Sequence, residues 1–258
     1  MPELADIEGM RRTLSTQLPG RLITEIEVLD AAILRNCDSV HFVRATIGLR
    51  FSEPARRGKW LLLPTDGPSL LVHCGMTGRA YAVDTPPVAR PDDRLVIQLD
   101  KGQLRYADRR KLRGIWLATD ADAVDDIIGP LGPDALGMTY RELTNVMQYS
   151  SRRLKVLLMD QRVIAGLGNT MTDEILWQAR LNPERQASSL TVAERRRLLQ
   201  TMQRSLRTAV QQGHIPRASD WLTGVRDEPD PGCPRCTTPL IHGRSHGRRT
   251  IWCPHCQG

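Results

Sequence analysis

The sequence lacks the features of a membrane-spanning or secreted protein. No apolar run approaches the roughly 20 residues that a membrane-spanning helix requires, and the beginning of the chain has no secretory signal pattern. No internal repeat is evident. We therefore expect a soluble, intracellular protein. With 258 residues and 40% hydrophobic residues, the chain is long enough for one large or two smaller domains with a sizeable core.

Acidic residues are outnumbered. Asp and Glu number 29 against 36 Lys and Arg, so the net charge is +7 and the sequence pI is about 9.4. This balance indicates a polyanionic partner, usually nucleic acid, although a solvated basic surface would give the same numbers. Basic clusters favour the partner; they lie at Arg109–Lys111, Arg152–Lys155, Arg195–Arg197 and Arg248–Arg249.

The six cysteines divide into two isolated ones and two pairs. Cys37 and Cys74 lie alone within apolar stretches, so we expect inert, buried thiols. The pairs are Cys233-Pro-Arg-Cys236 and Cys253-Pro-His-Cys256, separated by 16 residues. In an intracellular chain this spacing predicts a zinc site rather than disulfides. Four thiolates close a tetrahedral shell, so a single zinc ion per chain would have a structural role.

The first half of the chain has the pattern of short strands behind one helix. Apolar positions at helical spacing, from Leu4 to Leu14, predict a helix over 3–18 that stops at Pro19-Gly20. Turn signals at 66–68 and 100–102 separate short β-type runs, which predicts a sandwich or barrel. The predicted strands are Leu22–Leu29, Ala45–Phe51, Trp60–Leu63, Ser69–His73, Leu95–Leu99 and Ile115–Ala118.

The second half is helical. We predict helices over 140–149, 152–160, 169–180 and 191–212, the last with Thr191 as N-cap and Glu194 completing a capping box. Residues 213–232 are rich in Gly, Pro, Asp and Arg and are predicted as a linker or loop. The expected fold class is α+β: a helix and β-sandwich over 1–128, a helical domain over 129–213, and a linker with a zinc ribbon over 214–258.

Between two predicted helices, the segment from Leu157 to Asn169 contains Gly166 and Gly168 and then opens a helix at Asn169. Glycines let backbone approach a phosphate closely, and a helix N-terminus offers unpaired N–H groups to an anion. An ordinary helix-helix turn with glycine caps is the alternative.

Together with Asp173–Leu176 and Asn182-Pro183, this segment resembles the helix-two-turn-helix of the formamidopyrimidine-DNA glycosylase and endonuclease VIII family. The resemblance covers essentially the whole chain and is nearer the formamidopyrimidine branch. It includes the Met1–Leu4 start, the Arg56–Lys59 hairpin, the His73–Gly78 motif and the two cysteine pairs. These motifs occur in the family's order along the chain.

The resemblance implies an enzyme that excises damaged, oxidised or ring-opened bases and then cuts the abasic strand. Pro2, exposed by removal of Met1, would be the nucleophile that forms a Schiff base, since a secondary amine readily forms an iminium. Glu3 would act as general acid and base; alternatively it is a first-turn carboxylate that favours the helix dipole. Lys59 matches the family lysine that assists β-elimination, and Asp6 replaces a longer family carboxylate.

Flipping a base leaves a hole in the duplex, which the family fills with wedge side chains. Met76 matches one wedge, and the loop over 106–112 suggests Arg110 and Leu112 as the others. Because Arg113 looks inserted, the register could shift to Arg109.

The resemblance also carries over phosphate contacts and an acidic residue. Lys155, Asn169 and Arg248 match the family's grips, with Arg249 a near-equal candidate, and Arg248 would assist δ-elimination. Glu174 matches an acid that orients the sugar-phosphate site or Pro2. The implied partner is double-stranded DNA with damaged bases or abasic sites, bound by a monomer in the cytoplasm at the nucleoid.

Two departures from the family pattern affect the substrate. The segment from Gly213 to Cys233 is shorter than the region that caps an oxidised purine, which puts 8-oxoguanine specificity in doubt. Asp92 stands where a phosphate-contacting histidine is expected, and an acid facing DNA would repel phosphate. Three hypotheses remain: a bifunctional glycosylase and lyase, a lyase acting on abasic sites only, and a non-catalytic binder of damaged DNA.

Overall fold

The computed structural model describes residues 2–84 and 90–258, and the chain divides into two compact units. One unit comprises residues 2 and 6–130, and the other comprises residues 3–5 and 131–258. In the part of the chain described, no helix is long and apolar enough to cross a membrane.

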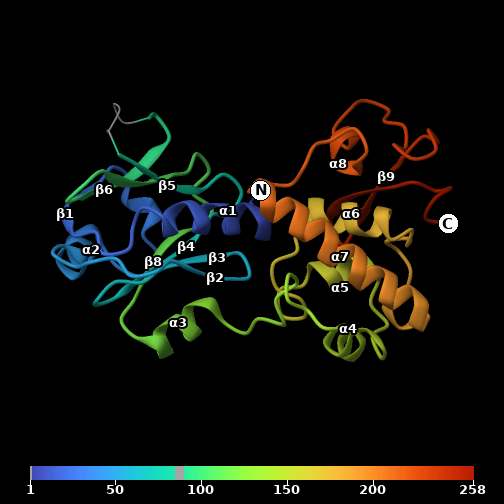
Figure 1. The fold of residues 1–258 in the computed structure, drawn as a ribbon, viewed down its shortest axis with the longest axis horizontal. Coiled ribbons are helices and arrows are strands. Elements are labelled where there is room, and N and C mark those ends of the chain that lie inside the picture. Colours follow the sequence, from blue (N-terminus) through green and yellow to red (C-terminus); the bar gives the residue numbers. More distant parts are fainter. Residues whose placement is uncertain (1, 85–89) are drawn as a thin grey trace. The chain divides into compact units, whose positions relative to one another are not determined.

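The first unit is built on two four-stranded antiparallel sheets (Figure 1). One sheet has the order β1-β6-β7-β5, with β1 at Ile23–Val28, β6 at Asp93–Leu99, β7 at Gln103–Ala107 and β5 at Arg79–Val83. The other has the order β2-β3-β4-β8, with β2 at Ala55–Arg57, β3 at Trp60–Leu63, β4 at Ser69–His73 and β8 at Gly114–Ala118. The helices of this unit are α1 (Leu4–Ser15), α2 (Ser39–Thr46) and α3 (Ala121–Ile128), with a short 3-10 turn, η1, at Ala31–Ile33.

A single apolar cluster joins the two sheets. It contains Leu61 and Leu70 from one sheet, Ile97 and Leu104 from the other, and Ile7 from α1, all buried. Since each sheet buries one face against this cluster, the predicted sandwich with an attached N-terminal helix is confirmed.

Strand register places two distant segments side by side. In the pair β4–β8, His73 lies opposite Gly114, and in the pair β5–β7, Arg79 lies opposite Ala107. The segment 74–78 joins β4 to β5, and the loop 108–113 joins β7 to β8. Because these strands are paired at the ends from which the two segments start, the segments lie side by side.

Some element predictions were wrong. The segment predicted as a strand over Ala45–Phe51 begins in α2, which Asp38 caps by accepting a hydrogen bond from the His41 N–H. After α2 this segment forms only isolated bridges. Strands β5 and β7 were not among the strands named from the sequence, and β2 was expected only as part of the Arg56–Lys59 hairpin. In β7 the buried Arg105 forms an ion pair with Asp93 at 3.1 Å, so a charge occupies a core position and hides the alternation.

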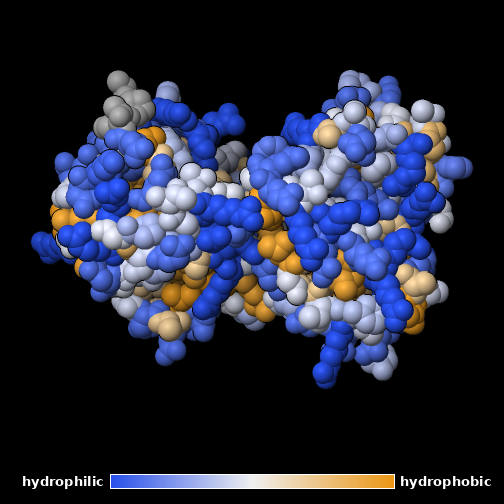
Figure 2. All heavy atoms as spheres, in the orientation of Figure 1, coloured by the Kyte–Doolittle hydropathy of each residue, from blue (hydrophilic) through white to orange (hydrophobic). Residues whose placement is uncertain are grey.

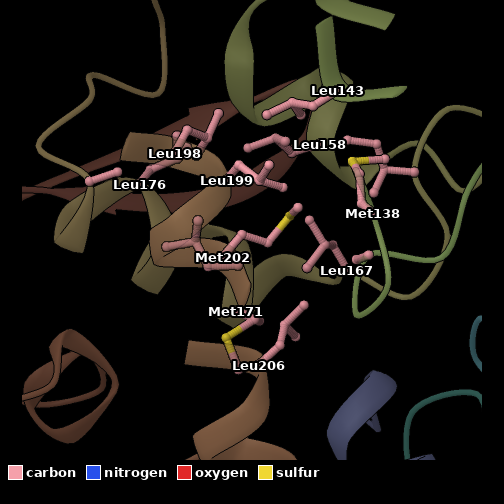
Figure 3. Close-up of a cluster of buried hydrophobic side chains, with 14 of the residues drawn as sticks. Met138, Leu143, Leu158, Leu167, Met171, Leu176, Leu198, Leu199, Met202 and Leu206 are labelled. Atoms are coloured by element: carbon pink, nitrogen blue, oxygen red, sulfur yellow. The ribbon is translucent and has the colours of Figure 1, made fainter. Parts of the chain in front are cut away.

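The second unit is helical. Its helices are α4 (Tyr140–Met147), α5 (Leu154–Met159), α6 (Asn169–Gln178), α7 (Val192–Gln212) and α8 (Leu222–Val225), with a 3-10 turn, η2, at Ala187–Ser189. Figure 3 shows leucine and methionine side chains from α4, α5, α6 and α7 directed at one another in one cluster. The capping box of Thr191 and Glu194 at the start of α7 is confirmed.

A two-stranded hairpin ends this unit. It pairs β9 (Ile241–Ser245) with β10 (Arg248–Trp252) and lies between the two cysteine pairs. A small cluster that includes Trp177 of α6, Leu222 of α8 and Ile251 of β10 holds the hairpin against the helices. The segment 213–232, predicted as a loop, thus contains α8.

Hydrophilic residues cover most of the visible face of each unit (Figure 2).

Candidate active site and metal centre

The Glu3 carboxylate is buried against the N-terminus of α6. It accepts hydrogen bonds from the backbone N–H groups of Gly168 (2.8 Å), Thr170 (2.8 Å) and Met171 (3.3 Å). The N–H groups that the sequence suggested for an anion therefore bind a carboxylate of the chain itself. The dipole that Glu3 complements is that of α6 and not of its own helix.

Two glycines permit this approach. A Cβ atom on Gly168 would lie 2.3 Å from the Cδ atom of Glu3, and one on Gly166 would lie 2.4 Å from Leu4 Cδ1. Gly166 also has a φ of +104°, a conformation that favours glycine. The Leu4 N–H donates to the Gly166 carbonyl at 3.2 Å, so backbone and side chain together fix residues 3–4 on the turn.

Pro2 lines a cavity of about 550 Å³ in the first unit. The other lining residues are Asp6, Met10, Met76, Thr77, Gly78, Arg79, Asp92 and Arg109. Asp92, expected to repel phosphate, forms an ion pair with Arg79 at 3.1 Å, and the Arg79 guanidinium lies 5.6 Å from the centre of the Tyr81 ring. Its negative charge is thus balanced within the protein. Met1 lies outside the described residues.

The three predicted wedge residues lie on the adjoining segments 74–78 and 108–113. The Arg110 guanidinium lies 2.9 Å from the Met76 sulfur, and the Arg110 N–H donates to Asp108 and Thr77. Met76 and Leu112 are 41% and 51% exposed, so both apolar residues reach the surface. Arg110 contacts Met76, and both Met76 and Arg109 line the Pro2 cavity.

Lys59 lies in the tight turn between β2 and β3 and is half-buried. Near it, burial and, to a smaller extent, the positive charges of Arg113 and Lys59 lower the pKa of His73 from 6.5 to about 4. His73 accepts a hydrogen bond from the Gly75 N–H on Nδ1 at 3.1 Å, which holds the start of the segment 74–78.

The structure places Lys155, which the resemblance suggested as a phosphate grip, inside the second unit. Its ammonium group donates to Asp173 and to the Arg249 carbonyl, both at 2.7 Å, and Asp173 also pairs with Arg226 at 2.9 Å. Paired buried charges need such complete satisfaction, because an unpaired one is very costly. Lys155 therefore fixes β10 to α5 and α6.

Glu174 is also buried. It accepts hydrogen bonds from the Gln178 side chain (2.7 Å) and from the Thr223 N–H (2.9 Å). Burial raises the pKa of Glu174 to about 7, although these hydrogen bonds oppose the shift. In this structure Glu174 holds α8 on α6.

Three predicted phosphate grips remain at or near the surface of the second unit. Asn169 is the first residue of α6, and its side-chain oxygen has no hydrogen-bond partner among the described residues. Arg248 and Arg249 begin β10 and are exposed. Arg249 donates to Asp227 (3.0 Å) and to the Arg226 carbonyl (2.7 Å), which attaches β10 to the end of the 213–232 segment.

Four cysteines form a candidate metal centre. The sulfur atoms of Cys233, Cys236, Cys253 and Cys256 all lie within 4.8 Å of one another. Cys236 is 3.5 Å from Cys253 and 3.4 Å from Cys256. A tetrahedral ion with metal–sulfur bonds of about 2.3 Å separates its ligands by about 3.8 Å. The sulfur atoms are positioned to bind one metal ion.

Sequence reasoning missed the residues that hold these groups. Arg79 directly follows the His73–Gly78 motif, and Asp173 belongs to the recognised stretch Asp173–Leu176, but neither was given a role. Trp177 had no sequence signal, because its indole meets Cys233 across 56 residues of chain.

Comparisons with known proteins agree with this geometry. Residues 1–115 match the family described as formamidopyrimidine-DNA glycosylase N-terminal domain, and residues 131–219 match the formamidopyrimidine-DNA glycosylase H2TH domain. Formamidopyrimidine-DNA glycosylases from Pelotomaculum thermopropionicum and Symbiobacterium thermophilum are 36% and 35% identical to the whole chain, which covers 99% and 89% of those proteins. The alignment with the first spans 279 positions, more than this chain has.

Solved structures give the same result. The Lactococcus lactis Fpg in complex with DNA containing an abasic site superposes with a TM-score of 0.88 at 25% identity, and 99% of each chain is covered. A mutant of that protein in complex with DNA containing Fapy-dG gives 0.89 at 25% identity, again over 99% of each chain. The chain belongs to the formamidopyrimidine-DNA glycosylase family of base-excision-repair enzymes, which combine DNA glycosylase and AP lyase activity.

Proposed function

We propose that this member of the family removes damaged bases from double-stranded DNA and cuts the resulting abasic strand with Pro2 as nucleophile. The observation that carries the proposal is the buried carboxylate of Glu3, the residue that follows Pro2 in the chain. It accepts hydrogen bonds from three N–H groups at the N-terminus of α6. A carboxylate held next to the nucleophile in the chain suits general acid-base catalysis.

The chemistry then follows from the two adjacent residues. Once Met1 is removed, the secondary amine of Pro2 attacks the sugar C1′ and the base leaves with a proton that Glu3 supplies. Loss of the amine proton then lets the C1′–O4′ bond break, with O4′ taking up a proton, and this ring opening gives an iminium that acidifies the C2′ proton. Removal of that proton breaks the bond to the 3′ phosphate, and a second elimination releases the 5′ phosphate. Hydrolysis of the imine frees Pro2.

DNA is held by groups from both units in this proposal. Met76, Arg110 and Leu112 fill the space that the flipped base leaves, and the exposure of all three and the contact between Arg110 and Met76 support this role. Asn169, Arg248 and Arg249 contact phosphates, Lys59 assists β-elimination and Arg248 assists δ-elimination. Lys155 and Glu174 support these groups from inside. We place the protein, as a monomer, in the cytoplasm with the chromosomal DNA.

The ion in the cysteine site is proposed to be zinc, one per chain. Four thiolates and no open position are typical of structural zinc. The ion would hold together the two cysteine turns, Cys233–Cys236 and Cys253–Cys256, which are called knuckles below. It would thereby keep β10, with Arg248 and Arg249, against α6.

The proposed lesions are oxidised or ring-opened bases. The names of the relatives and the Fapy-dG complex of the Lactococcus lactis protein support ring-opened purines. The 213–233 segment is short, and α8 with its hydrogen bond to Glu174 holds it in place. This argues against a large cap over the base.

Parallel assays of base release and strand nicking separate the alternatives. We expect release of ring-opened purines and nicking of abasic DNA by one preparation. Nicking without release of any lesion would leave only the AP lyase, and binding without either activity would leave only a damage-binding protein.

A further inference from the structure

Trp177 connects α6 to the metal-binding cysteines. It lies in the last turn of α6, its side chain is 3% exposed, and it packs in the cluster that contains Cys233 and Cys253. The indole N–H donates to the Cys233 sulfur at 3.3 Å. An indole N–H has no acceptor capacity, so the sulfur is the accepting partner whichever form the cysteine takes.

A second contact fixes the orientation of this indole. Arg235 belongs to the Cys233–Cys236 knuckle, and its guanidinium lies 4.2 Å from the centre of the Trp177 ring. The same guanidinium donates to the Trp177 carbonyl at 3.3 Å. The ring is thus held on one face by Arg235 and at its N–H edge by Cys233, so the knuckle contacts α6 through both side chain and backbone.

At its other end, α6 holds Glu3. The helix has ten residues, which span about 15 Å at 1.5 Å per residue. Its first turn provides the N–H groups that bind the Glu3 carboxylate, and its last turn provides Trp177. A short, continuous helix transmits a displacement of one end to the other with little bending.

We propose that Trp177 is a positioning residue that joins the metal-loaded knuckle to α6 and, through α6, sets the position of Glu3. The proposal rests on the proposed metal site. A hydrogen bond to a metal-bound thiolate orients the ligand and offsets its charge, and loss of such a partner typically weakens metal binding about 10–100-fold. The knuckle in turn limits the movement of the helix that binds Glu3.

The test compares Trp177→Phe with Trp221→Phe in the full chain. Phenylalanine keeps an aromatic ring under Arg235 but removes the N–H donor. Trp221→Phe makes the same change in the same unit, at the N-cap of α8. For both variants and the parent, the rate of zinc transfer to a colorimetric chelator and the thiolate-to-cobalt charge-transfer band of the cobalt-loaded protein are measured.

We expect Trp177→Phe to lose zinc about 10–100-fold faster than the parent, with Trp221→Phe unchanged. Its charge-transfer band moves to lower energy, because the missing hydrogen bond no longer lowers the energy of the sulfur lone pairs. Simple loss of packing would not move that band. Equal release rates and bands in the parent and Trp177→Phe would overturn the proposal, whereas a parent that binds neither ion would instead refute the proposed metal site.

Hydrogen exchange tests the link to Glu3. In Trp177→Phe, the amides of Thr170 and Met171, which donate to Glu3, are expected to exchange several-fold faster than in the parent and in Trp221→Phe. Faster zinc loss with unchanged exchange at these two amides would refute the transmission through α6.

Discussion

The contact between Gly168 and Glu3 allows a sharp prediction, because an added methyl group can only collide with the candidate acid. In Gly168→Ala, the ideal Cβ would lie 2.3 Å from Glu3 Cδ, 2.6 Å from Oε1 and 2.7 Å from Cγ. The backbone at Gly168 has φ −120° and ψ −167°, extended values that alanine adopts without strain. The full effect therefore falls on the Glu3 side chain.

The magnitude follows from the geometry. Non-bonded carbon atoms prefer separations of about 3.5–4.0 Å, so the carboxylate must move by roughly 1 Å or more. That movement breaks hydrogen bonds of 2.8 Å and adds overpacking strain, so we expect a stability loss of about 1–3 kcal/mol. A misplacement of about 1 Å at a catalytic group lowers the rate about 100-fold.

Single-turnover nicking of abasic DNA and urea unfolding measure the two effects. Gly137→Ala is the matched control, since a Cβ there meets nothing within 4 Å. In the background of Glu3→Ala the collision partner is gone, so Gly168→Ala should then cost no more stability than Gly137→Ala. Parent-like nicking and stability in Gly168→Ala would refute the placement of Glu3.

Three further predictions concern the other groups. The pKa of Glu174 in the folded protein is about 7, above the ordinary 4.5. Between these two pH values the native state binds more of this proton than the unfolded state does, so stability falls as pH rises through this window. Glu174→Gln should flatten that fall in urea unfolding at pH 5 and pH 8; an identical slope would contradict the raised pKa. Arg79→Gln leaves the Asp92 charge unbalanced, so the affinity for abasic DNA should fall. The magnitude of the slope of log affinity against log salt concentration should also decrease by about 1. Unchanged binding titrations would exclude Arg79 from the DNA interface. Chelation of the metal should loosen the ribbon and weaken DNA binding; equal affinity of the metal-free protein would contradict a role for the ion.

The sequence predicted elements best where local patterns agree with tertiary structure. The helix over 191–212 has both a capping box and a long amphipathic pattern, and the structure matches it within a residue. Strand β7 was missed because Arg105 is buried with Asp93, a pairing that only the sheet register reveals. The segment Ala45–Phe51 looked like a strand because it is rich in β-branched and apolar residues. The same residues also fit the end of α2 and the turn that follows it.

Candidate site residues were found through motifs, but their surroundings were not. Glu3 was recognised beside Pro2, yet its attachment to α6 joins residues 165 positions apart. Lys155 was matched to a phosphate grip, and only the structure reveals Asp173 as its partner. Asp92 looked like an unbalanced charge until Arg79 was found beside it. In each case the missing information was a long-range side-chain contact.

The central claim, that Pro2 is the nucleophile, is tested most directly by borohydride reduction in the presence of abasic DNA, with mass analysis of the trapped peptide. The account predicts a covalent adduct on a terminal peptide that begins with Pro2 and lacks Met1. Protein that binds abasic DNA but forms no adduct, forms it on another residue, or retains Met1 in the active preparation would contradict the claim.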